Sequence, residues 1–258
     1  MLITALILGL LGWVVGTFAT HRAEAVMVGR PLRQPQCPYC TEAYDPVQWS
    51  AIASFVSGRR RCASCGRPVR QARLAGELFV TLTWGLLGWR FGVSLRVIFS
   101  LLSLVPLAMV MVTDLETKRI PNLIMMPSIL AALILGTIFG PPLPSLASWA
   151  WWHSVAGAFI GFAVFRILVW LGTALFGEGA LGEGDMTLAT YAGAVVGFPV
   201  IIEALILSFF LGGLGALLVL VFGRNASLET AIPYGPFIVL GTGLALIWGP
   251  EIVMWFMG

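Results

Sequence analysis

The stretch VIIEALILSFFLGGLGALLVLVF (residues 200–222) contains one ionisable residue, Glu203, in a run long enough to cross a bilayer as a helix. Similar apolar stretches occupy most of the remaining chain. Of its 258 residues, 59% are hydrophobic and 10% are charged, and the mean hydropathy is +0.94. A soluble domain of this size cannot bury so much apolar surface. The sequence therefore predicts an all-α polytopic membrane protein.

About eight transmembrane helices are expected, separated by polar loops or by glycine and proline. Two neighbouring spans are divided at GFPV (197–200), where Gly197 and Pro199 favour a turn. The first apolar stretch could alternatively be a cleaved signal peptide, although no basic residue precedes it. The expected spans are residues 2–19, 75–91, 95–113, 122–139, 147–175, 186–199, 200–222 and 233–257.

The distribution of basic residues predicts the orientation in the membrane. Nine of the fifteen lysines and arginines lie between the first and second spans. They are Arg22, Arg30, Arg33, Arg59, Arg60, Arg61, Arg67, Arg70 and Arg73. Because basic loops are retained on the cytoplasmic side, residues 20–74 are expected in the cytoplasm. Alternating the eight spans then places both termini outside.

The cytoplasmic loop contains two cysteine pairs, CPYC (37–40) and CASC (62–65), which include all four cysteines of the chain. Two such pairs can surround one tetrahedral zinc ion, and four thiolates leave no open position for water, so the zinc would be structural. The alternatives are two disulfides, disfavoured in a reducing compartment, or buried thiols without a role. We expect three domains: a first helix (1–19), a four-cysteine zinc-binding domain (20–74) and a membrane domain (75–258). The expected ligands are Cys37, Cys40, Cys62 and Cys65.

Two aspartates are expected at the same, cytoplasmic, membrane boundary. Asp114 ends the third span in TDLETKRIPN (113–122), and Asp185 begins the sixth in GEGDMTLA (182–189). Two carboxylates in a partly desolvated site share a proton, so one can deprotonate water while the other polarises a carbonyl. Gly182 and Gly184 would admit a substrate backbone. The alternatives are a helix N-cap at Asp185 and a polar loop entrance at Asp114.

Several motifs occur in the order found in one family. VGTF (15–18) is followed by HR (21–22), and the two cysteine pairs flank Trp49. Glu77 opens the second span, and AIPYGPF (231–237) precedes the last one. Together with TDLETKRIPN and ALGEGDMTLA (180–189), these motifs resemble the type IV prepilin leader peptidases, which are GxGD membrane aspartyl proteases.

The resemblance implies that Asp114 and Asp185 are catalytic. It implies as substrates the prepilins and type II secretion pseudopilins of the bacterial inner membrane, which carry a basic leader before a hydrophobic helix. Cleavage after a glycine would be followed by S-adenosylmethionine-dependent N-methylation, at a cofactor site that the motifs do not identify. Glu116 and Glu183 lie beside the proposed catalytic segments and are candidates to bind the leader. Besides substrate, membrane lipids are expected partners and nucleic acid is not.

The chain also departs from the family pattern. The family's Tyr-Pro before the glutamate is absent from RLAGE (73–77), and Thr187 replaces a lysine. His21 is expected to be a loop residue without a role. A different class remains open, a proton-coupled transporter or channel with a structural zinc loop, because membrane-embedded carboxylates also mark ion pathways. A scaffold that recruits a cytoplasmic partner through the zinc loop is a further alternative.

Overall fold

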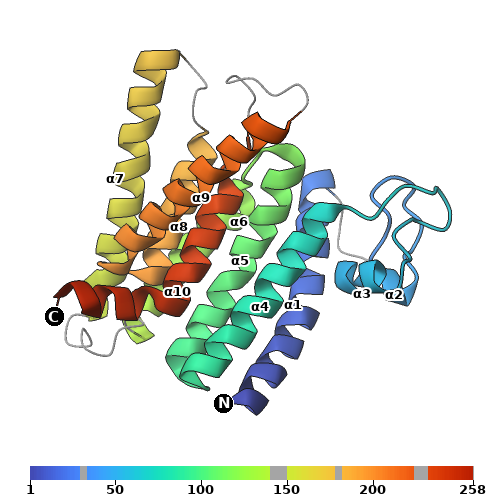
Figure 1. Ribbon diagram of the computed structural model, residues 1–258, viewed down its shortest axis with the longest axis horizontal. Coiled ribbons are helices and arrows are strands. Elements are labelled where there is room, and N and C mark those ends of the chain that lie inside the picture. The colour runs from blue at the N-terminus through green and yellow to red at the C-terminus, as the bar shows by residue number, and fades with distance from the viewer. Residues whose placement is uncertain (30–33, 140–149, 178–181, 224–231, 258) are drawn as a thin grey trace. The chain divides into compact units, whose positions relative to one another are not determined.

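A computed structural model describes residues 1–29, 34–139, 150–177, 182–223 and 232–257. The described regular structure is helical apart from two isolated bridges, Gln36 to Ala43 and Arg61 to Pro68. The helices are α1 (Leu2–Val28), α2 (Pro46–Trp49), α3 (Ala51–Val56), α4 (Gln71–Phe91), α5 (Leu95–Thr117), α6 (Asn122–Phe139), α7 (Ala150–Phe176), α8 (Glu183–Val196), α9 (Val200–Phe222) and α10 (Gly235–Met257). Figure 1 labels them in chain order.

The eight predicted spans correspond to eight of these helices, which confirms the all-helical membrane fold. Within the described residues, five helices are long and apolar enough to cross a membrane: α1, α5, α6, α7 and α9. The helix α8 has only 14 residues, and α9 begins at Val200, so the chain does turn at GFPV as predicted.

The first helix is longer than predicted, because α1 continues to Val28 instead of ending near residue 19. Its last turns contain Thr20, His21 and Glu24, which hydropathy places in a loop, yet all three side chains are buried. Thr20 donates to the Thr17 carbonyl of its own helix, whereas His21 and Glu24 meet polar partners from α4 and the cysteine-rich segment. The helix ends at Gly29, whose φ of 66° forms a left-handed cap.

The chain divides into two compact units. The first contains Met1–Val93 and Leu104–Lys118, and the second contains Ser94–Ser103 and Arg119–Gly258. The division into domains at residues 19 and 74 stays a prediction. In the first unit, α1 and α4 lie side by side and α2 and α3 lie beside them (Figure 1).

Small residues let α1, α4 and the end of α5 approach closely in the first unit. A Cβ at Gly12 would lie 2.9 Å from the Cβ of Trp84, and one at Gly76 would lie 2.9 Å from a methyl carbon of Val112. Ala23, Ala72 and Val112 form a buried apolar cluster at this junction. The backbone of α4 therefore packs directly against the turn of α5 that precedes Asp114.

In the second unit, α7 and α8 contact through their backbones. A Cβ at Gly193 would overlap the carbonyl group of Gly157, and a Cβ at Gly161 would overlap that of Ala189. Small residues of this kind give helices in membranes their close packing, which is a main source of their association. The Tyr191 hydroxyl donates a 2.8 Å hydrogen bond to the Ser103 carbonyl and links α8 to the start of α5.

Replacing Gly193 by Leu is expected to separate α7 from α8, because no space exists for a side chain there. Overpacking of this kind costs about 1–3 kcal/mol, so the unfolding temperature in detergent should fall by several degrees. Gly213→Leu is the matched control, since Gly213 is exposed on α9 and nothing lies within 4 Å of its missing Cβ. Equal unfolding temperatures for the two variants would contradict the close packing of α7 on α8.

Candidate functional site

The two cysteine pairs lie in tight hairpin turns of the same design. In the first, the Cys37 N–H donates to the Glu42 carbonyl at 2.8 Å, and the Thr41 N–H donates to the Cys37 carbonyl at 3.0 Å. In the second, the Cys62 N–H donates to Arg67 at 2.9 Å and the Gly66 N–H donates to Cys62 at 2.9 Å. Each turn directs its two sulfur atoms toward the other pair.

The four sulfur atoms lie within 4.8 Å of one another. The Cys37 and Cys65 Sγ atoms are 3.7 Å apart, as are those of Cys40 and Cys62. A tetrahedral zinc ion with bonds of about 2.3 Å separates its sulfur ligands by about 3.8 Å, so the cluster fits such an ion. A backbone hydrogen bond from Cys65 lowers the pKa of the Cys62 thiol to about 7. These distances confirm that the four cysteines predicted as ligands can hold one metal ion.

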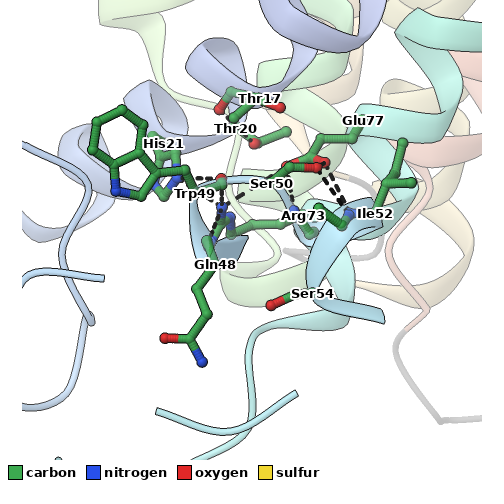
Figure 2. Close-up of polar contacts among 12 residues, drawn as sticks. Thr17, Thr20, His21, Gln48, Trp49, Ser50, Ile52, Ser54, Arg73 and Glu77 are labelled. Carbon is green, nitrogen blue, oxygen red and sulfur yellow. Dashed lines mark hydrogen bonds and ion pairs between the residues drawn. The ribbon is translucent and has the colours of Figure 1, made fainter. Parts of the chain in front are cut away.

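A buried carboxylate on α4 caps the short helix α3 beside the cysteine-rich segment (Figure 2). Glu77 accepts hydrogen bonds from the backbone N–H groups of Ala51 (2.8 Å) and Ile52 (3.0 Å). It also accepts one from the Ser50 hydroxyl at 2.7 Å. The Trp13 indole of α1 donates to the same hydroxyl at 2.7 Å. Because free N–H groups at a helix N-terminus attract anions, α3 and the Glu77 carboxylate stabilise each other.

A buried arginine lies beside Glu77. Arg73 donates from Nη2 to the Trp49 carbonyl (2.5 Å) and lies 2.7 Å from His21 Nε2, as Figure 2 shows. It also pairs with the carboxylates of Glu77 (3.8 Å) and Glu24 (3.9 Å). Nε2 of His21 also lies 2.7 Å from the Trp49 carbonyl, so the imidazole and the guanidinium share this one acceptor, and Nδ1 of His21 is 3.8 Å from Glu24. The prediction of His21 as a loop residue is therefore wrong: it is a buried residue of α1.

Sequence reasoning missed this network. The chain offered two signals of its own: the histidine of the HR motif, and the arginine and glutamate of RLAGE four residues apart. An arginine can be buried at that place because Glu24 and Glu77 supply its counter-charges.

Asp114 lies in the last turns of α5 and is 4% exposed. Its carbonyl accepts a hydrogen bond from the Lys118 N–H at 2.8 Å. Two residues later, Glu116 pairs with Arg70 at the start of α4 (3.6 Å), and Arg70 also faces Glu24 (3.9 Å). Asp114 is therefore a buried helical residue, and the loop-entrance alternative does not describe it.

Asp185 lies in the first turn of α8, and the N-cap residue is Gly182. The cap interpretation of Asp185 therefore does not hold. A Cβ at Gly182 would meet only Asp185 Oδ2, at 3.4 Å, whereas one at Gly184 would lie 2.9 Å from Ile120 Cβ. Glu183 is exposed.

Tyr234 lies near Asp185 in the second unit, close enough for the charge of that carboxylate to act on its hydroxyl. The Tyr234 ring packs beside those of Phe165 and Phe209, with ring centroids 6.0 Å and 6.4 Å away. The structure places each aspartate within its own unit, Asp114 in the first and Asp185 in the second.

Two protein-family models match successive segments of this chain. A model of the bacterial peptidase A24 N-terminal domain matches residues 10–91, and a model of the type IV leader peptidase family matches residues 99–217. A prepilin leader peptidase/N-methyltransferase of Bacillus subtilis (strain 168) is 27% identical over 97% of both chains.

Proteins of the same name give similar matches. That of Pseudomonas putida is 29% identical over 84% of this chain and 73% of its own, and that of Legionella pneumophila is 26% identical over 92% and 80%. No solved structure matches. The first family model covers the cysteine-rich segment with its flanking helices, and the second covers both aspartate motifs. The chain therefore belongs to the type IV leader peptidase family and is a multi-pass membrane protein of a bacterial inner-membrane family.

Proposed function

We propose that this protein is a prepilin leader peptidase and N-methyltransferase. It removes the leader of type IV prepilins and type II secretion pseudopilins and then methylates the new amino terminus. The observation that carries the proposal is the match to a Bacillus subtilis protein of that name over 97% of both chains. Both family domains are also present in order.

Asp114 and Asp185 are proposed to supply the two carboxylates of the peptidase. One carboxylate, which is ionised, takes a proton from a water molecule as the oxygen of that water attacks the carbonyl carbon of the scissile bond. The other, protonated, donates its proton to the carbonyl oxygen. As the C–N bond breaks, the first carboxyl gives the proton taken from water to the leaving nitrogen, and the second regains its proton from the hydroxyl of the intermediate. The burial of Asp114 supports this role, since carboxyl groups withdrawn from water can divide the acid and base roles between them.

The substrate is proposed to present a basic leader in water and an apolar helix in the bilayer, on the cytoplasmic face, with both termini of the enzyme outside. Glu183 is exposed in the first turn of α8 and is available to bind a cationic leader. Glu116, which pairs with Arg70, is proposed to bind the leader as well. A Cβ at Gly182 would lie 3.4 Å from Asp185 Oδ2, so the missing side chain leaves the backbone beside this carboxylate free for a substrate chain to approach. Contact of Gly184 with Ile120 already explains its missing side chain, so the proposed backbone approach depends mainly on Gly182.

Two further components complete the proposal. Zinc is the metal that the four cysteines would hold, and its role is structural because the four thiolates fill a tetrahedral site. S-adenosylmethionine, when bound, supplies the methyl group. Its binding residues are not assigned.

The test is incubation of the purified protein in detergent with a purified prepilin and S-adenosylmethionine labelled in its methyl group. We expect release of the leader, a single new amino terminus after the leader glycine, and label on the mature pilin only. A prepilin whose leader glycine is replaced is the control and should remain intact. A folded enzyme that leaves the natural prepilin uncut would contradict the peptidase. Cleavage without label would contradict only the methyltransferase.

A further inference from the structure

The cysteine-rich segment is attached to the membrane helices of the first unit mainly by buried polar contacts. Glu77 accepts three hydrogen bonds from Ser50, Ala51 and Ile52, and its side chain is 0% exposed (Figure 2). The apolar cluster of the segment itself is small, made by Cys37, Tyr44 and Cys62 with Cys40 against them. The position of the segment on the helices therefore depends on hydrogen bonds that form only when α3 is folded.

Arg73 stabilises the same contact from the other side. Its fully buried guanidinium binds the carbonyl of Trp49, in the residue before Ser50, and contacts His21 on α1. It also balances the charges of Glu77 and Glu24. Buried charges are costly without partners, so loss of one contact weakens the others. The network links α1, α4 and the segment that carries the cysteines.

The start of α4 in turn contacts α5 on both sides of Asp114. Gly76, next to Glu77, packs against Val112, two residues before Asp114. Arg70 pairs with Glu116, two residues after it. Three residues at the start of α4 make these contacts: Arg70 is its N-cap, and Arg73 and Glu77 lie in its first two turns. A shift of α4 would therefore move the backbone that carries Asp114.

We propose that Glu77 and Arg73 are positioning residues that couple the metal-bound fold of the cysteine-rich segment to the position of Asp114. Neither touches substrate. Their effect on catalysis acts through α4 and α5, so it rests on the proposed peptidase function. The coupling itself is a property of the first unit and exists without substrate.

The first measurement is hydrogen exchange of the full-length protein in detergent, with zinc bound and after removal of zinc by a chelator. In the wild type, zinc removal should speed exchange in residues 34–70, at the start of α4 and in residues 108–117 of α5. In Glu77→Gln, zinc removal should affect residues 34–70 while α5 exchanges at the same rate with or without zinc. The expected change in α5 of the wild type is about ten-fold, within the range of coupling between sites.

The second measurement is the rate of prepilin cleavage. Glu77→Gln keeps the size of the side chain but removes a charge and at least one acceptor. We expect kcat to fall about 10²-fold with KM almost unchanged, since a misplacement of about 1 Å costs that much. Asp45→Asn is the matched control, because Asp45 pairs with Arg59 on the exposed surface of the same segment. It should keep the kcat of the wild type.

These results distinguish the possible failures. The coupling would be overturned if zinc removal left the exchange rate of α5 in the wild type unchanged. It would also be overturned if Glu77→Gln, folded and loaded with zinc, kept the kcat of the wild type. Neither result would affect the peptidase function. A wild type that shows the exchange pattern but cleaves no prepilin would refute the proposed function and leave the coupling supported. If Glu77→Gln does not fold, Ser50→Ala removes one of the three hydrogen bonds to Glu77, together with the contacts of the Ser50 hydroxyl with Trp13 and the Ala53 N–H, and should show the same effects with two acceptor contacts of Glu77 retained. Wild-type exchange coupling and kcat in Ser50→Ala would also overturn the proposal.

Discussion

Replacement of Asp114 or Asp185 by Asn is expected to lower the rate of prepilin cleavage by about 10³-fold, because general acid or base catalysis contributes about 10²–10⁴-fold. Asparagine has nearly the size of aspartate but neither takes a proton from water nor donates one at neutral pH. The measurement is the single-turnover rate of leader release by each variant. Its unfolding temperature in the same detergent shows whether the variant is folded.

The two single variants and the double variant should be similarly inactive, since residues that act as a unit give effects that do not add. Each variant should still methylate a mature pilin supplied already cleaved, because that reaction does not use the peptidase carboxylates. Asp45→Asn again controls for loss of one carboxylate, since its surface pair with Arg59 lies outside both aspartate motifs. Normal cleavage by either folded variant would show that the aspartate concerned is not catalytic.

The membrane helices could be predicted because their signal is local. Runs of apolar residues interrupted by glycine, proline or charge predicted the helices α1 and α4–α10 of the described residues and the turn between α8 and α9. The cysteine cluster was also predictable, since each turn is built from four consecutive residues and a tetrahedral ion needs two such pairs. The two aspartate motifs were also recognisable, because each is a short run of consecutive residues at the end of an apolar stretch.

The end of α1 and the polar network were not predictable from hydropathy, because their cause lies in distant residues. Hydropathy predicts a loop at Thr20, His21 and Glu24. In the folded chain, Arg73 of α4 is a buried polar partner for His21 and Glu24. The acceptor of the shortest Arg73 hydrogen bond is a backbone carbonyl, that of Trp49, and backbone groups leave no signal in a sequence. The sequence showed the arginine of RLAGE, but it did not show that Arg73 lies 3.9 Å from Glu24.

Removal of zinc is expected to unfold the cysteine-rich segment while the helices of the second unit remain folded. A structural zinc ion contributes about 10–16 kcal/mol in small domains at pH 7, which few other contacts can replace in a short segment. The described part of the segment has one small apolar cluster, and three of its four members are cysteines. Without the ion, these thiols lose their common ligand and the two turns separate.

Limited proteolysis followed by mass spectrometry measures this effect. Chelation, or the double substitution of Cys62 and Cys65 by Ser, should make residues 34–70 cleavable and leave α7–α9 protected. Trypsin suits the experiment, because Arg59, Arg60 and Arg61 lie consecutively and exposed between the two cysteine turns. Added zinc should restore protection to the chelated wild type but not to the serine variant, which has two ligands fewer.

Because Glu77 caps α3 only when that helix is folded, protection of the segment should also fall in Glu77→Gln at limiting zinc. Equal protection with and without zinc would mean that Glu77 and Arg73 alone hold the segment on the helices, and that the four cysteines are not needed for its fold.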